Sequence, residues 1–223
     1  MASKFIVIEG LDGCGKATQT EILCQKLIDM GKKVTKLTFP VYESPSSSLV
    51  KMYLNGDFGD NAEDVNPYIA SSFYAVDRVA SYLQSWKSDY ENQDFIVADR
   101  YTTSNIIYQM AKIEEQSKKD YIDWLYDFEY NKLGIPKPDM VIYLDVNPDI
   151  SQKLMSNRYN GDENKKDIHE KDVDFLLTCR KSALLAAEKL DWKVIDCCDE
   201  NGILSIDCIS KKIFDVLNSM FDI

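Results

Sequence analysis

Five short runs of apolar residues, separated by longer stretches with helical periodicity, constrain the fold of this chain more than any other feature of its sequence. The runs are Phe5–Ile8, Val34–Phe39, Phe95–Ala98, Met140–Leu144 and Val194–Ile195. Apart from Val34–Phe39, which contains two threonines and a lysine, each run is continuous rather than alternating, as in parallel strands that helices cover on both faces. This alternation of strands and helices predicts an α/β fold with a five-stranded parallel sheet, whose ligands bind at the carboxyl ends of the strands.

The stretches between these runs have the pattern of amphipathic helices, which we expect at about 16–30, 46–56, 66–83, 102–114, 118–133, 148–158, 172–190 and 203–220. Asn66 and Pro67 are typical of a helix cap and a first turn. The stripe that this helix is expected to turn toward the core comprises Ile69, Phe73, Val76, Ala80 and Leu83. No repeat or linker divides the chain, so residues 1–223 are expected to form one domain.

The charge balance excludes some classes of partner. Acidic residues outnumber basic ones by 37 to 26, and the net charge is −11. Nucleic-acid binders and helices attracted to anionic lipid need a basic face, so neither partner is expected. No apolar run approaches the roughly 20 residues of a membrane helix, and the N-terminus has no export pattern. Since the six cysteines also lack metal-ligand spacing, we expect a cytoplasmic protein with reduced thiols.

A glycine-rich segment follows the first apolar run. Gly10, Gly15 and Lys16 have the spacing of a phosphate-binding loop between a strand and a helix. Its N–H groups and the helix N-terminus would point at phosphate oxygens, while the lysine reaches the β/γ oxygens. The predicted loop comprises Gly10, Leu11, Asp12, Gly13, Cys14, Gly15, Lys16, Ala17 and Thr18. The alternative is a glycine-rich turn that binds nothing.

The loop departs from the strict motif at one position. Ala17 stands where Ser or Thr would hold Mg²⁺, and Thr18 lies about 100° further round the helix. We therefore expect water-mediated binding of Mg²⁺, anchored by Asp12 or Asp99. Cys14 is interpreted as a small residue whose backbone matters, with an oxidisable thiol beside Lys16 as the alternative.

Only four of the 26 Lys and Arg residues are arginines, namely Arg78, Arg100, Arg158 and Arg180. Arginine suits a bidentate grip on phosphate or on a base edge, so these positions are informative. Arg100 follows Asp99 at a predicted strand end, where it could clamp a phosphate beside a metal-anchoring carboxylate. Arg78 lies one turn after Tyr74, which suits a stacked and hydrogen-bonded base, or else a tyrosine packed under a solvated arginine. Arg180 is expected to be structural.

Two further segments carry polar residues. If 102–109 is helical, then Asn105, Tyr108 and Gln109 share one face beside the end of the third strand. The segment of about 156–171 is rich in glycine and charge, and it is expected to form a mobile lid. Its cations would be Arg158, Lys165 and Lys166, although the two lysines could equally be solvated. His169 is expected to face solvent.

Taken together, these segments resemble the thymidylate kinase family of the P-loop nucleoside-monophosphate kinases. The segments that carry the resemblance are FIVIEGLDGCGKATQT (5–20), Phe39-Pro40, Tyr74–Arg78, DRYTTSNIIYQ (99–109), PDMVIYLDVNP (138–148), DIHEKD (167–172) and WKVID (192–196). They span nearly the whole chain, and their order and spacing are specific. The resemblance implies a P-loop NTPase fold, transfer of a phosphoryl group from ATP to dTMP with Mg²⁺, and a homodimer.

The resemblance also implies roles for single residues. On the donor side, Lys16 and the backbone of 10–18 hold the ATP phosphates, Asp99 helps to place Mg²⁺, and Arg158 closes on the donor phosphates. On the acceptor side, Asp12 would face the 3′-hydroxyl, Tyr108 would disfavour ribonucleotides, and Arg100 would hold the phosphate. Tyr74 would stack on thymine, and Arg78 and Asn105 would read the polar edge of the base. Phe39 and Tyr42 would line the site. The implied catalytic set is Lys16, Asp12, Asp99 and Arg158.

Two departures from the family pattern leave alternatives open. Many relatives carry an arginine after the Phe-Pro pair, where this chain has Val41-Tyr42-Glu43, so Arg100, Lys51 and backbone amides would hold the acceptor phosphate. Gly13 stands where some relatives have a basic residue, which resembles the bacterial type that relies on lid cations. The alternatives are another nucleotide kinase of this fold, or a P-loop protein that binds nucleotide without catalysis.

Overall fold

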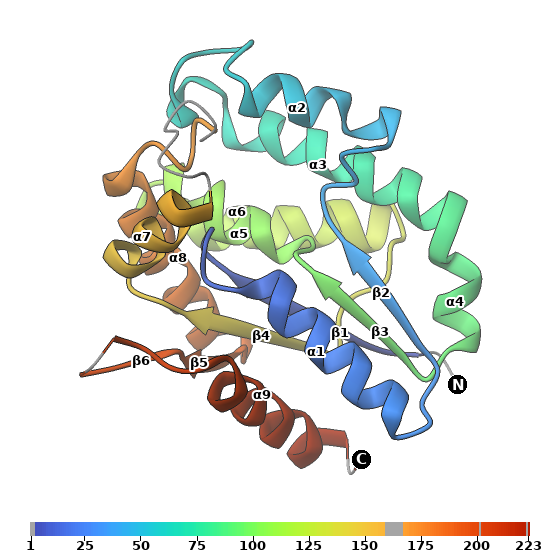
Figure 1. Cartoon of the computed structure of the whole chain (residues 1–223). Coiled ribbons are helices and arrows are strands. Elements are labelled where there is room, and N and C mark those ends of the chain that lie inside the picture. The colour runs from blue at the N-terminus through green and yellow to red at the C-terminus, as the bar shows by residue number, and fades with distance from the viewer. Residues whose placement is uncertain (1–2, 159–166, 201, 222) are drawn as a thin grey trace.

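The computed structural model describes residues 3–158, 167–200, 202–221 and 223, with the backbone alone for 155–158. At its centre lies a five-stranded sheet in the order β2-β3-β1-β4-β5 (Figure 1). The strands are β1 (Lys4–Gly10), β2 (Val34–Thr38), β3 (Phe95–Asp99), β4 (Met140–Asp145) and β5 (Lys193–Asp196). Every neighbouring pair is parallel, so the predicted α/β fold class is confirmed.

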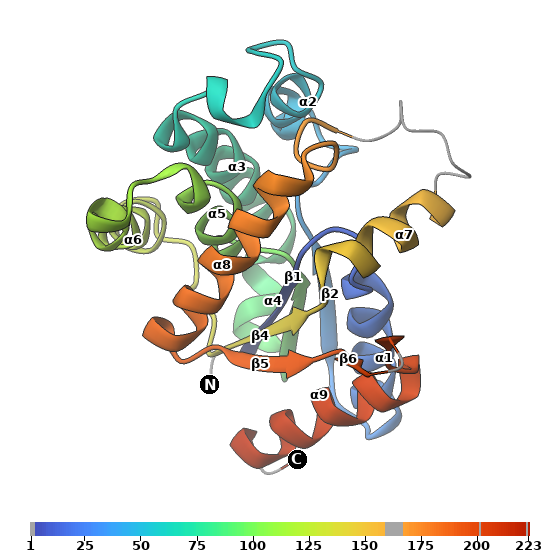
Figure 2. The same cartoon turned by 90° about the vertical axis from the view of Figure 1, so that its left-hand side faces the viewer.

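Helices cover both faces of the sheet. Their bounds are α1 (Lys16–Asp29), α2 (Ser48–Leu54), α3 (Pro67–Ser81), α4 (Lys87–Asn92), α5 (Thr103–Tyr108), α6 (Lys118–Tyr126), α7 (Pro148–Arg158), α8 (Val173–Leu190) and α9 (Ile206–Phe221). Helices α5, α6 and α8 lie on one side, whereas α1 and α9 lie on the other (Figure 2). A short antiparallel pair, β6 (Cys198–Asp199) and β7 (Gly202–Ile203), precedes α9. No helix in the described part of the chain is long and apolar enough to cross a membrane.

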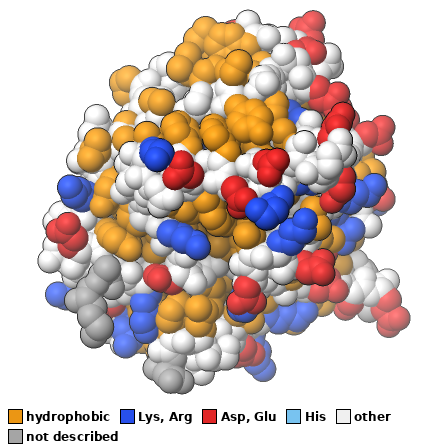
Figure 3. Space-filling view, turned by 180° about the vertical axis from the view of Figure 1, so that it is seen from behind, with side chains coloured by type: hydrophobic (Ala, Val, Ile, Leu, Met, Phe, Trp, Pro, Cys, Tyr) orange, Lys and Arg blue, Asp and Glu red, His pale blue; other side chains and the backbone are white. Residues whose placement is uncertain are grey.

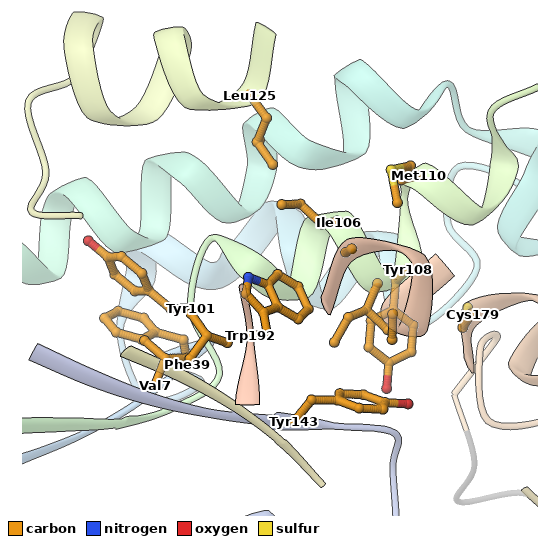
Figure 4. Packing of buried hydrophobic residues seen from close by; sticks show 14 of the residues in the cluster. Val7, Phe39, Tyr101, Ile106, Tyr108, Met110, Leu125, Tyr143, Cys179 and Trp192 are labelled. Carbon is orange, nitrogen blue, oxygen red and sulfur yellow. The ribbon is translucent and has the colours of Figure 1, made fainter. Parts of the chain in front are cut away.

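Alternate residues of the three central strands, β1, β3 and β4, enter the two hydrophobic layers, as the pleat of a doubly covered sheet requires. In β1, Phe5 and Val7 pack on the side of α5 and α8, while Ile6 and Ile8 pack on the side of α1. The first layer is rich in aromatic rings, which Figure 4 shows from close by. The ring centres of Phe5 and Tyr101 lie 4.8 Å apart, edge to face.

The expected inward stripe of α3 was wrong. Ile69 and Val76 are each 52% exposed and Leu83 is 64% exposed. The helix instead buries its opposite side, with the small residues Ala70, Ser71 and Ala75 together with Asp77 and Arg78. The small side chains allow close packing, and Arg78 finds a buried carboxylate partner, so the polar side faces inward and the apolar stripe is left outside.

Three other expected helices have different bounds in the structure. The one at 102–114 ends as α5 at Tyr108 and continues as a 3₁₀ turn, while α6 widens into a π-helix over Asp127–Lys132. The helix expected at 203–220 begins only at Ile206, because Gly202 and Ile203 pair with β6 as strand β7. Helix α4, which follows α3 through a π-helical turn, was not predicted.

The turn after β1 generates a stability prediction. Gly10 has a φ of +155°, and a Cβ there would lie 2.9 Å from the carbonyl oxygen of Leu144 in β4. We expect Gly10→Ala to lower the free energy of unfolding by about 1–3 kcal/mol more than Gly31→Ala. Gly31 is the matched control because it also has a positive φ, +78°, but its Cβ would meet no atom within 4 Å. Equal losses in urea unfolding would contradict the predicted contact.

Candidate active site

The predicted phosphate-binding loop lies between β1 and α1. Gly15, with a φ of +89°, is the N-cap of α1 and has no side chain to occupy the first N–H groups of the helix. Lys16 is buried, and its Nζ donates to the carbonyl oxygen of Leu11 at 2.9 Å, inside the curl of the loop. Burial also raises the pKa of Cys14, which favours the interpretation of that residue as a small packed side chain.

Three of the predicted residues meet beside this loop. Arg100, directly after β3, has a φ of +67° and forms an ion pair with Asp12. The hydroxyl of Tyr108 in α5 donates to Asp12 Oδ2 at 2.8 Å. Burial would raise the pKa of Asp12, but Arg100 and then Lys16 hold it well below its usual range. Asp12 is therefore an ionised acceptor between two cations.

Asp99, the last residue of β3, fits a metal-bound role. It is buried, and its Oδ1 has no hydrogen-bond partner in the structure. A carboxylate oxygen of this kind needs a cation or a water to satisfy it. Within residues 3–158, 167–200, 202–221 and 223, no group of three or more His, Cys, Asp or Glu side chains could hold a metal. One or two carboxylates are what Mg²⁺ needs when nucleotide phosphates and waters supply its other ligands.

Glu9, which the sequence patterns did not single out, fixes the segment after Arg100. Its fully buried carboxylate accepts hydrogen bonds from the N–H of Tyr101 at 3.1 Å, Thr103 Oγ1 at 2.7 Å and Ser104 Oγ at 2.9 Å. These contacts join the end of β1 to the turn after β3. The available signal was an acidic residue inside an otherwise apolar strand.

The residues predicted to read a base converge on a second missed carboxylate, Glu129. Arg78 is 2% exposed and forms an ion pair with Glu129, with Nε at 2.7 Å from Oε2. Asn105 Nδ2 lies 3.3 Å from Glu129 Oε1. Tyr74 is half-buried one turn before Arg78, with its ring edge-on to Tyr53 at 6.4 Å. The alternative of a tyrosine packed under a solvated Arg78 is therefore wrong, because Arg78 is buried and paired with Glu129.

The segment after β2 holds the remaining acceptor-side predictions. Phe39 precedes a cis peptide bond to Pro40, and it is buried against Tyr101 with ring centres 5.6 Å apart. Tyr42 is 49% exposed, and Lys51 Nζ donates to its carbonyl oxygen at 3.0 Å.

A third missed carboxylate, Asp77, holds this same segment in place. It is buried on α3 and accepts from the N–H of Val41 at 2.8 Å and from Ser46 Oγ at 2.6 Å. The segment after β2 is thereby tied to the helix that carries Tyr74 and Arg78.

His169 does not face solvent as expected. It is 4% exposed, its Nε2 is hydrogen-bonded to the hydroxyl of Tyr53 at 2.8 Å, and its ring stacks on Tyr108 with ring centres 5.4 Å apart. Burial, and then the charge of Lys112, lower its pKa to about 3, so the ring is neutral. The polar neighbours suggested a solvated loop, but a neutral, hydrogen-bonded imidazole can be buried.

Other predictions concern the region around the lid. Arg158 ends α7, but its side chain and the whole of 159–166, with Lys165 and Lys166, lie outside the described residues. Arg180 is structural as expected, because it pairs in a bidentate manner with Asp145 of β4, with both distances 2.7 Å.

Comparisons with known proteins agree on one family. A family model described as thymidylate kinase matches residues 8–205. The thymidylate kinase of Mycobacterium tuberculosis is 31% identical over 171 residues, which cover 76% of this chain and 78% of that protein. One from Prochlorococcus marinus strain MIT 9312 is 30% identical and covers 99% of this chain and 98% of its own length.

The fold agrees with a solved structure as well. A thymidylate kinase from Candida albicans superimposes with a TM-score of 0.69 at 24% identity, covering 98% of this chain and 92% of that one. This likeness confirms the predicted P-loop NTPase fold.

The site also generates a prediction about pH. Asp167 Oδ1 accepts from the N–H of His169 at 2.8 Å and of Glu170 at 2.9 Å. Burial, and then the charges of Asp12 and Glu170, raise the pKa of Asp167 to about 7. Because the folded state binds this proton more tightly than the unfolded state, the stabilisation is complete below about pH 4 and is lost as the pH rises through 7.

We expect Asp167→Asn, which keeps an acceptor without the charge, to equal the parent chain in thermal stability at pH 4 and to exceed it by a few degrees at pH 8. Thermal unfolding followed by circular dichroism at both pH values measures this difference. A variant that is less stable at pH 8 would show that the carboxylate charge is favourable.

Proposed function

We propose, from the premise that this chain belongs to the thymidylate kinase family and transfers a phosphoryl group from ATP to dTMP, that the reaction takes place where Asp12, Asp99 and Arg100 meet. The observation that carries this proposal is the contact of Arg100 and Tyr108 with Asp12 beside the phosphate-binding loop. The two alternatives, another nucleotide kinase and an inactive binding protein, receive no support from the comparisons.

On the donor side, Lys16 and the backbone N–H groups of 10–18 bind the phosphates of ATP. Because Ala17 offers no hydroxyl, Asp99 and Asp12 would hold Mg²⁺ through water. The unpartnered Oδ1 of Asp99 supports this assignment. A metal ion held there would neutralise charge on the transferring phosphoryl group.

On the acceptor side, Arg100 binds the phosphate of dTMP, and Asp12 accepts a hydrogen bond from the 3′-hydroxyl. The charges around Asp12 keep its carboxylate ionised, which suits an acceptor. Tyr108, whose hydroxyl holds Asp12, crowds the 2′ carbon and so disfavours ribonucleotides. Phe39 and Tyr42 line the site, while Tyr74 stacks on the base that Arg78 and Asn105 read.

The chemistry needs no strong general base, because a phosphate oxygen of dTMP is already anionic at neutral pH. The single histidine, His169, is buried and neutral, which agrees with this requirement. Catalysis then depends on in-line positioning and on cations around the loose transition state. We assign Arg158, in a lid of about 156–171, to the donor phosphates, and residues 1–223 to a single domain.

A homodimer is the assembly that the surface favours. The exposed apolar side chains of α2, α3 and the segments beside them form what we call the α3 face: Leu49, Met52, Phe58, Ile69, Val76 and Leu83, each 39–64% exposed. Figure 3 shows apolar side chains gathered over the upper part of the molecule, where α2 and α3 lie. Exposed apolar side chains gathered in this way are typical of a protein interface.

We also propose that the protein works in the cytoplasm. All six cysteines are free, which suits a reducing compartment.

The proposed reaction is tested by ADP release from ATP and Mg²⁺, with dTMP, dUMP, UMP, dCMP, dGMP and dAMP compared in parallel. We expect turnover with dTMP well above that with dUMP and little with the other acceptors. No turnover with any acceptor, together with measurable ATP binding, would contradict the proposal.

Arg100→Ala links this activity to the assigned site. We expect its KM for dTMP to rise roughly tenfold or more, since one charge-assisted contact is lost, while its KM for ATP changes little. Arg180→Ala is the matched control, because it removes a guanidinium that pairs with Asp145, and its KM for dTMP should stay near that of the parent chain.

The dimer prediction is tested with Val76→Glu, which adds a charge to the α3 face. Sedimentation should show a dimer for the parent chain and a monomer for the variant, because burying an unpaired charge in an interface is costly. Lys119→Glu, on an exposed position of α6 that the proposed interface does not use, serves as the control and should stay dimeric.

A further inference from the structure

Glu129 is a buried carboxylate to which the proposed mechanism gives no role. It is fully buried in the π-helical turn after α6, and it lies between two residues assigned to the base, Arg78 and Asn105. Its Oε2 accepts from Arg78 Nε at 2.7 Å and from Thr102 Oγ1 at 3.0 Å. Its Oε1 accepts from Arg78 Nη2 and from Asn105 Nδ2. A single carboxylate therefore contacts both.

The contacts of Asn105 decide which way its amide points. Nδ2 lies 3.3 Å from Glu129 Oε1 and 3.5 Å from the carbonyl oxygen of Ser71. Both neighbours can only accept hydrogen bonds, so the NH₂ group must face them. Oδ1 consequently points elsewhere, and no donor within the described residues satisfies it. Asn105 is left with an acceptor for a ligand.

The same carboxylate fixes the donor character of Arg78. A guanidinium has five N–H groups. In Arg78, the N–H of Nε and one N–H of Nη2 donate to Glu129, and one N–H of Nη1 donates to the carbonyl oxygen of Tyr101 at 3.4 Å. Burial would lower the pKa of Arg78, but Glu129 raises it, so the group stays charged. Two N–H groups are left to donate to a ligand.

We propose that Glu129 is a positioning residue that sets the hydrogen-bond polarity of the base site. With both oxygens of Glu129 accepting from these two side chains, Arg78 presents a donor and Asn105 presents an acceptor. Thymine and uracil offer the complement, an acceptor at O4 and a donor at N3–H. Cytosine offers the reverse at both positions, a donor at N4 and an acceptor at N3. This inference rests on the proposed assignment of Arg78 and Asn105 to the base.

Stability alone explains Glu129 poorly. A buried ion pair recovers little more than its desolvation cost, and well-packed apolar residues often serve the fold as well or better. A site with fixed donors and acceptors rejects a base that has the reversed pattern, because binding of the wrong base leaves buried polar groups of the site without hydrogen-bond partners. The π-helical turn, a feature common at functional sites, belongs to the same local structure.

The experiment measures kcat/KM for dTMP, dUMP and dCMP in Glu129→Gln. The new amide can donate toward Asn105, which frees that side chain to turn its NH₂ group toward the base. We expect the ratio of dTMP to dCMP to fall by roughly tenfold or more, mainly through KM, while the ratio of dTMP to dUMP is kept because both bases present the same edge. Equal losses for all three acceptors would overturn the proposal.

Thr102→Val is the matched control. It removes a hydrogen bond to Glu129 but leaves Arg78 and Asn105 facing the carboxylate. We expect a lower melting temperature with an unchanged ratio of dTMP to dCMP. If this variant relaxed the ratio as much as Glu129→Gln, loss of packing rather than polarity would be the cause, and the proposal would fail.

The double variant Glu129→Gln/Asn105→Asp keeps the test valid if the single variant does not fold. It retains one carboxylate in the cluster, and the ionised side chain that replaces Asn105 can offer the base only an acceptor. We expect discrimination against dCMP to return, and a double variant without it would count against the proposal. Turnover of dTMP by the parent chain is measured first. If the parent chain shows none, the proposed function fails; if it shows turnover, the variants test the role of Glu129 alone.

Discussion

The carboxylate of Glu9 joins the ends of β1 and β3, and the arrangement of the site depends on this junction. It accepts hydrogen bonds from Tyr101, Thr103 and Ser104, directly after the positive φ of Arg100. A left-handed conformation is unfavourable for arginine and persists only where its surroundings hold it. With the turn fixed, Arg100 reaches back to Asp12 in the phosphate-binding loop, and Asp99 stays at the strand end.

Glu9, Asp77 and Glu129 serve the site in the same physical way. Each is buried, and each satisfies its oxygens with donors from a different segment of the chain. Burying a carboxylate costs free energy unless it is hydrogen-bonded. Each of these carboxylates therefore favours the one arrangement of the chain that brings donors to it. Asp77 thereby fixes the segment after β2, and Glu129 fixes the two side chains assigned to the base. Three of the 37 acidic residues of this chain thus hold segments of its interior in place.

Tyr108 connects Asp12, to which the proposal assigns the sugar hydroxyl, to the C-terminal part of the predicted lid. Its hydroxyl donates to Asp12, and its ring stacks on His169, whose Nε2 is hydrogen-bonded to the hydroxyl of Tyr53. Lys112 donates to the same Tyr53 hydroxyl at 2.7 Å. The residues from 167 onward are therefore anchored on the acceptor side, beside the position assigned to the deoxyribose.

Local patterns in the sequence were sufficient for the five strands of the main sheet, the glycine-rich turn between β1 and α1, and the Asn66 cap, whose side chain accepts from the N–H of Tyr68 as expected. These features depend on neighbours along the chain, such as glycine at a positive φ or an apolar run of strand length. The inward face of α3 and the burial of His169 depend instead on partners far away in sequence. Glu129 lies 51 residues from Arg78. Since the cost of burying a charge or an imidazole is set by whether a partner meets it, only the tertiary structure could decide which polar residues are inside.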